Sequence, residues 1–306
     1  MHLAKISFFA GFVVLFSAMG VHADDAASHL PPTVYGYPIG QSVEVLNVTA
    51  PEEAKKMGFE YLELALQNLL PLSDVDFSNQ VQRISYIGIP AHSGYGFLPA
   101  DLQVVGNNVD NAHLDDVVRR SLGRVRKLRL KMVVYGKDLA GTRKVPEGFS
   151  REVARKQFLE FMQRAAIEAQ NRGMTILIEP MPPESADLIN TVAEGLEFVE
   201  GDGRPNVQLL VDYTSFVQSK EDREVLKRAA PRIGQVEIQN PNGRVYPASA
   251  DESDYASFFR ALKEGGYRGG FSVSGKPGDA VVDGPRAITV LRTLAATFEE
   301  DDKSKP

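Results

Sequence analysis

Short runs of apolar residues alternate along this chain with longer stretches in which apolar positions recur every three or four residues. A short apolar run predicts a buried strand, and the longer spacing predicts an amphipathic helix. The runs predict eight strands, over residues 34–39, 61–65, 87–91, 132–135, 175–179, 207–212, 233–239 and 270–273. The longer spacing predicts helices between them, over residues 51–57, 114–128, 151–171, 192–199, 220–229, 255–264 and 285–298.

Eight strands interleaved with helices over about 250 residues favour a closed barrel over an open doubly wound sheet. We therefore expect an α/β fold made of a single (β/α)8 TIM barrel, spanning residues 33–298. Residues 24–32 are predicted to be a linker into the barrel. The charged residues 299–306 are predicted to be a disordered tail.

Residues 1–23 have the composition of a signal peptide. Lys5 precedes an apolar run over residues 6–19, and small residues at Val21 and Ala23 suit a cleavage site. A membrane anchor is the alternative, but about 14 apolar residues are too few where about 20 are needed. The sequence thus predicts a periplasmic or secreted protein that makes no membrane contact after cleavage.

Charge and cysteine content exclude several classes of protein. The chain has no cysteine, which excludes disulfide bonds, and its formal net charge is −6. Basic residues within 119–131 recur at helical spacing, which is more typical of a solvated helix face than of a phosphate-binding patch. We expect no nucleic-acid partner. The sequence does not indicate an oligomeric state.

Acidic residues stand at the ends of three successive predicted strands: Glu179, Asp212 and Glu237. Because the carboxyl ends of parallel strands carry the chemistry of such folds, we expect these side chains to converge. Converging carboxylates repel one another and need a divalent cation, a bound proton or arginine partners such as Arg143 and Arg244. The alternative is that these acids cap helices or form ion pairs on the rim.

Oxygen ligands with water in the open positions suit Mg²⁺ or Mn²⁺, or Ca²⁺, better than Zn²⁺. We therefore predict a site for one divalent cation, Mg²⁺ or Mn²⁺, held by Glu179, Asp212 and Glu237, or else a site that holds no metal. The candidates for binding a substrate are His92 and Glu63, at the ends of the third and second predicted strands, together with Arg143 and Arg244.

Six short segments, in this order, resemble the xylose isomerase-like TIM barrel family, known as the sugar phosphate isomerase/epimerase superfamily, and in particular a secreted bacterial branch. They are GFEYLEL (58–64), GTRKVPEGF (141–149), IEPM (178–181), LINT (188–191), NPNGR (240–244) and LKEGGYRG (262–269). The resemblance implies a barrel that binds one divalent metal through a glutamate, an aspartate, a histidine and a second glutamate.

This chain departs from that ligand pattern. Glu179 and Asp212 match the first two ligands, but Glu237 stands where the resemblance places the histidine and Ser274 where it places the last glutamate. A second histidine of the family corresponds to Ser215, and no histidine follows His113. The resemblance therefore implies a degenerate metal site.

Two functional hypotheses remain open at this point. In the first, the protein is an exported isomerase, epimerase or lyase that acts on a carbohydrate or keto-sugar. Glu179 and Glu237 would then be the catalytic residues, abstracting a proton next to a carbonyl with or without a metal ion. In the second, the barrel binds a small-molecule carbohydrate but is catalytically silent, since it has lost the family's histidines and last glutamate. Action on abasic DNA is set aside, because the required histidine-rich zinc site is missing.

Overall fold

A computed structural model describes residues 39–43, 50–276 and 280–303, with side chains for residues 51–276 and 281–296. The predicted signal peptide and the linker lie outside the described residues, as do residues 34–38 of the first predicted strand. No helix among the described residues is both long and apolar enough to cross a membrane.

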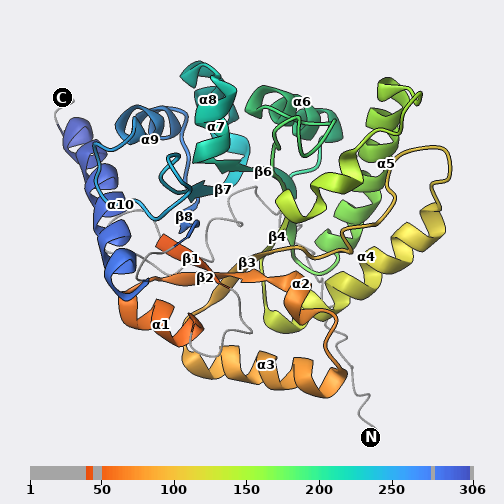
Figure 1. Ribbon diagram of the computed structural model, residues 1–306, viewed down its shortest axis with the longest axis horizontal. Coiled ribbons are helices and arrows are strands. Elements are labelled where there is room, and N and C mark those ends of the chain that lie inside the picture. The colour runs from red at the N-terminus through yellow and green to blue at the C-terminus, as the bar shows by residue number, and fades with distance from the viewer. Residues whose placement is uncertain (1–38, 44–49, 277–279, 304–306) are drawn as a thin grey trace, which may run out of the picture.

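Eight parallel strands close into a barrel in the order of the chain (Figure 1). The first strand pairs with both the second and the eighth, which closes the ring. The predicted (β/α)8 barrel is thus confirmed. The strands are β1 (Ile39–Val43), β2 (Tyr61–Ala65), β3 (Ala91–Tyr95), β4 (Met132–Tyr135), β5 (Thr175–Ile178), β6 (Val207–Asp212), β7 (Ile233–Ile238) and β8 (Gly270–Val273).

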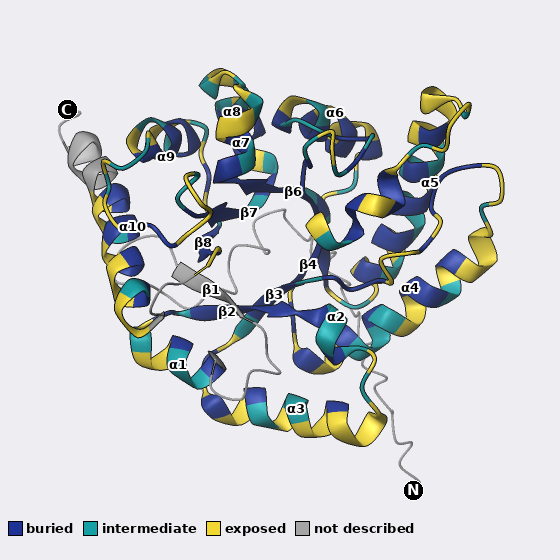
Figure 2. Ribbon diagram, viewed as in Figure 1, coloured by how far each residue is buried: buried dark blue, intermediate teal, exposed yellow. Residues whose placement is uncertain are grey.

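Helices surround the barrel, and their buried faces turn inward toward the strands (Figure 2). The α-helices are α1 (Ala50–Met57), α2 (Leu66–Leu69), α3 (Asp74–Ile87), α4 (Asn111–Val125), α5 (Arg151–Gln170), α6 (Val192–Asp202), α7 (Tyr213–Ser219), α8 (Arg223–Ala229), α9 (Tyr255–Glu264) and α10 (Ala280–Lys303). Short 3₁₀ helices are η2 (Arg126–Leu128), η3 (Lys137–Arg143) and η4 (Ala230–Arg232). Helix α10 extends five residues into the segment predicted as a tail.

The third strand was predicted four residues too early, because helix α3 was not recognised. Ser73 caps the start of α3 by accepting a hydrogen bond from the backbone N–H of Asp76, and Gly88 ends it in the left-handed conformation. The apolar residues Ile87 and Ile89 thus belong to a helix end and a turn. The predicted helix 220–229 begins three residues later, as α8, and helix α7, which Lys220 ends in the left-handed conformation, was not predicted.

The inside of the barrel is apolar toward β4, β5 and β6 and polar toward β2, β7 and β8. Met132, Val134, Leu177 and Leu210 form a buried cluster on the apolar side. On the polar side, the hydroxyl of Ser272 lies 3.0 Å from that of Tyr61 and accepts a hydrogen bond of 2.9 Å from the amide of Gln235. The side chains of both sides are buried and occupy the inside of the barrel, which places a ligand site beyond the carboxyl ends of the strands.

Candidate active site

Three acidic side chains lie at the carboxyl ends of neighbouring strands. Glu179 follows β5 directly, Asp212 is the last residue of β6, and Glu237 is its register partner on β7. All three are buried, with 6%, 4% and 8% of their surface exposed. A fourth acid, Glu63 on β2, is fully buried and acts on Glu237 through its charge. The convergence that the sequence predicts for these carboxylates is therefore present.

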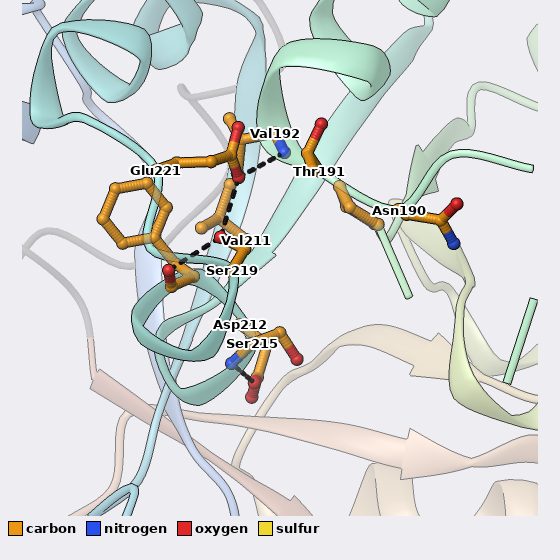
Figure 3. A pocket seen from close by; sticks show the side chains of 10 residues that line it. Asn190, Thr191, Val192, Val211, Asp212, Ser215, Ser219 and Glu221 are labelled. Carbon is orange, nitrogen blue, oxygen red and sulfur yellow. Dashed lines mark hydrogen bonds between the residues drawn. The ribbon is translucent and has the colours of Figure 1, made fainter. Parts of the chain in front are cut away.

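Both carboxylate oxygens of Asp212 already have partners. One accepts a 2.7 Å hydrogen bond from the backbone N–H of Ser215 and so caps helix α7 (Figure 3). The other accepts a 2.6 Å hydrogen bond from the side-chain amide of Gln239. Arg244 approaches the first oxygen at 3.7 Å. Asp212 is therefore a helix cap and an ion-pair partner, the alternative that the sequence left open.

A crevice of about 10 Å³ lies beside Asp212, between the starts of α6 and α7 (Figure 3). Across it, the carboxylate of Glu221 accepts hydrogen bonds from the backbone N–H groups of Val192 and Ala193, and the hydroxyl of Ser219 donates to it. A space of this size holds about one water molecule. The crevice therefore lies at the contact between the starts of α6 and α7, and it is too small to hold a sugar.

Glu179 is held by the segment that follows β4. One of its carboxylate oxygens accepts a 3.0 Å hydrogen bond from the backbone N–H of Lys137. Gly136 allows this close approach, because a Cβ at that position would lie 1.8 Å from the same oxygen. Behind Glu179, the guanidinium of Arg143 donates a 3.0 Å hydrogen bond to its backbone carbonyl. The orientation of Glu179 is therefore fixed from two sides.

Burial makes the charged forms of two of these acids costly. It raises the pKa of Glu179 to about 7, and the nearby charge of Asp212 contributes to the increase. Burial also raises the pKa of Glu237 well above its usual value, assisted by the charges of Glu63 and Glu179. Burial thus shifts both glutamates toward their protonated forms, and the pKa of Glu179, at about 7, lies near neutral pH.

Lys137 brings a positive charge to these acids and was not recognised from the sequence. Burial acts to lower its pKa, but the negative charges of Glu237, Glu179, Asp138 and Glu63 outweigh it and raise the pKa. Its ammonium lies 4.9 Å from the centre of the Tyr95 ring. Lys137 thus supplies a positive charge next to the carboxylates at the barrel mouth.

The structure assigns different positions to the predicted substrate-binding residues. Arg143 is fully buried beneath Glu179 and cannot reach a ligand, so its predicted contact with substrate is replaced by support of Glu179. His92 is the second residue of β3 rather than its last, and it packs edge-on against Tyr61 inside the barrel. Arg244 keeps a half-exposed side chain beside Asp212 and remains a candidate. Glu63 faces the other acids through the barrel mouth.

Two residues that follow strand ends, Lys137 and Gln239, were missed. Lys137 comes two residues after β4, and Gln239 comes directly after β7. The signal that selected the carboxylates, a polar side chain at the carboxyl end of a predicted strand, applies equally to both. Only acids were considered as candidates for metal ligands, and therefore the lysine and the amide were passed over.

The acids do not fit the divalent-cation site predicted for Glu179, Asp212 and Glu237. The described residues contain no group of three or more histidine, cysteine, aspartate or glutamate side chains that could hold a metal ion. The donor chemistry gives the reason: the oxygens of Asp212 are engaged by Ser215 and Gln239, and Glu237 favours its protonated form.

Comparison with known proteins gives consistent matches. The model of the family described as xylose isomerase-like TIM barrel matches residues 51–291. An L-ribulose 3-epimerase of Methylomonas sp. (strain DH-1) is 28% identical over 222 residues, which cover 71% of this chain and 73% of the epimerase. A second L-ribulose 3-epimerase, from Mesorhizobium japonicum, is 28% identical over 224 residues, covering 70% of each chain.

A solved structure of an L-ribulose 3-epimerase superposes with a TM-score of 0.73 at 19% sequence identity. The match covers 88% of this chain and all of the epimerase chain. At this level of identity the superposition supports the fold alone.

The raised pKa of Glu179 predicts a specific dependence of stability on pH. The unfolded chain releases this proton near pH 4.5, but the folded protein keeps it until about pH 7. Stability is therefore lost as the pH rises through this interval, by on the order of 3 kcal/mol for this group. Glu179→Gln removes this titrating group. The free energy of unfolding of the variant, measured in urea, should therefore rise relative to that of the wild type between pH 4.5 and 8. A difference between the two proteins that stays constant over this range would contradict the assignment.

Proposed function

This chain belongs to the xylose isomerase-like TIM barrel family, and we propose that it is a carbohydrate epimerase or isomerase that moves a proton at a carbon next to a carbonyl. The two curated epimerases support the reaction class, since each matches about 70% of the chain. The proposed ligand is a small-molecule carbohydrate with a keto group. No step of the proposal needs a phosphate on the substrate.

The proposal rests on the raised pKa values of the two buried glutamates, Glu179 and Glu237. A general base works best when its pKa lies near the working pH, and Glu179 meets that condition with a pKa of about 7. A general acid must hold its proton firmly, and burial among other acids raises the pKa of Glu237 well above its usual value. Two carboxyl groups with different pKa values are the usual assignment of base and acid in one site.

In the proposed reaction, ionised Glu179 takes the proton from the carbon next to the carbonyl. Negative charge then develops on the carbonyl oxygen, and the Lys137 ammonium is the positive group at the mouth that can stabilise it. Protonated Glu237 returns a proton to the same carbon. If it does so from the opposite face, the configuration inverts. Glu179 is then protonated and Glu237 ionised, and exchange of these protons with solvent restores the starting state.

The proposal also places the protein outside the cytoplasm, as the composition of residues 1–23 indicates. Export with cleavage after Ala23 is expected to yield a mature chain that begins at Asp24. Intact-mass measurement of the protein recovered from the periplasm of an expressing bacterium checks this. A full-length mass in the cytoplasmic fraction would contradict it.

Glu179→Gln is expected to remove exchange of the proton next to the carbonyl, because the amide cannot act as a base. The assay incubates the protein with L-ribulose and other ketoses in D₂O and follows deuterium incorporation by NMR. Loss of a general base lowers the rate by about 10²–10⁴-fold. Glu184→Gln, a substitution of an exposed glutamate on the rim, is the control and should leave the rate unchanged.

The alternative of a silent sugar-binding barrel predicts a different result. In that case no ketose exchanges deuterium, while calorimetry still detects a bound sugar whose affinity is the same in Glu179→Gln. That pair of results would overturn the enzymatic proposal.

Lys137→Met is expected to have two effects on the same exchange reaction. The rate should fall by about 10²-fold or more, since one donor to the developing oxyanion is lost. The pH at which the rate is half-maximal should rise, because the charge of Lys137 lowers the pKa of Glu179. Lys137→Arg keeps the charge and should keep the pH profile near that of the wild type. A lower rate with an unchanged pH profile in Lys137→Met would contradict this role.

A further inference from the structure

A second cavity, of about 680 Å³, lies beside the barrel mouth and is not part of the acidic site. We call it the α2–α4 cavity. It is bounded by the end of α2, by the loop after β3 over residues 96–101, by helix α4 and by Asp138. Figure 1 shows α2 and α4 as neighbours on the side of the barrel where this loop runs. Its volume is within the range of about 300–1,000 Å³ that is usual for sites of organic ligands.

The inner wall of the α2–α4 cavity is adjacent in sequence to the catalytic mouth at two points. Gly96 and Asp138 line the cavity, and each directly follows a residue of the mouth, Tyr95 and Lys137 respectively. Those two mouth residues contact one another, with the ammonium 4.9 Å from the ring centre. The cavity and the acidic site are thus joined by consecutive residues of the chain after β3 and after β4.

The lining of the cavity is largely apolar, with Leu70, Pro71 and Pro99 among its exposed walls, and the charged residues Asp101, Arg120 and Arg124 also line it. Two buried oxygen atoms lie in the lining as well, Oε1 of Gln67 and Oδ2 of Asp138. Neither atom has a hydrogen-bond partner within the part of the chain that the structure describes. A buried acceptor without a partner is costly, so both atoms call for a donor from a ligand or from water.

We infer that the α2–α4 cavity binds the non-reacting part of the substrate, and that this part is an apolar ring bearing a hydroxyl group, as in a phenolic glycoside. The ring would lie among Leu70, Pro71 and Pro99, and its hydroxyl would donate to the carboxylate of Asp138. This inference rests on the proposed function, since it extends the substrate of the same mouth. A second sugar ring fits less well, because it would bring many hydroxyl groups to apolar walls.

The test compares the binding of three probes by calorimetry: methyl, phenyl and 4-hydroxyphenyl β-D-glucoside. Since binding is measured and no reaction is needed, a protein that turns over no ketose can still support the inference. We expect 4-hydroxyphenyl glucoside to bind at least tenfold more tightly than methyl glucoside. The hydroxyl should account for about tenfold over phenyl glucoside, since a hydrogen bond to a charged group is worth about that factor.

Three variants locate the effect. Ala100→Phe places a ring at the exposed edge of the cavity and should abolish the preference for aromatic glucosides without changing the affinity for methyl glucoside. Ala256→Phe adds the same ring to the exposed face of α9 and should change nothing. Asp138→Ala should remove only the contribution of the hydroxyl group. Thermal melting of each variant confirms that it folds.

Equal affinity of the wild type for the three glucosides would overturn the inference, as would a preference that survives in Ala100→Phe. Tight binding of maltose that Ala100→Phe abolishes would also overturn it, because the cavity would then be a second sugar subsite. Deuterium exchange with ketoses but no aromatic preference would overturn this inference alone. Aromatic preference without exchange would instead overturn the proposed reaction and leave the cavity assigned.

Discussion

The burial of several carboxyl groups at one end of a barrel is the constraint on which this site depends. Each buried charge loses its hydration, and neighbouring negative charges add repulsion. The protein meets this cost differently for each acid. Asp212 accepts hydrogen bonds from Ser215 and Gln239, while burial and neighbouring charges favour the protonated form of Glu237. Glu179 lies between these extremes, because Lys137 and Arg143 oppose the effect of burial.

The supporting contacts explain how such a site stays ordered. Gly136 lets the backbone of the β4 loop reach the carboxylate of Glu179, and Arg143 holds the backbone of the same residue from below. A guanidinium that is fully buried serves here as a scaffold for the base. The mouth therefore consists of acids whose geometry is set by the loops after β4, β6 and β7, and a lysine supplies the positive charge.

The loops after β2, β3 and β4 extend this arrangement away from the acids. Lys137, in the segment after β4, contacts Tyr95 at the end of β3, while the next residue, Asp138, lines the α2–α4 cavity. Two consecutive residues of this segment, Lys137 and Asp138, thus contribute to the acidic site and to the cavity respectively. In barrels of this kind the strands fix where chemistry takes place, and the length and composition of the loops decide the size of what can bind.

The sequence by itself determined the barrel and the convergence of Glu179, Asp212 and Glu237, because strand periodicity and the parallel order of βα units act locally and leave few topologies. Its motifs also identified the family. It misplaced the third strand, where Ile87 and Ile89 suit a helix end as well as a strand. Only the tertiary structure decided that Arg143 is buried, that Asp212 caps a helix and that Lys137 faces the acids. Burial, charge and hydrogen-bond partners arise between segments distant in sequence, and no local pattern records them.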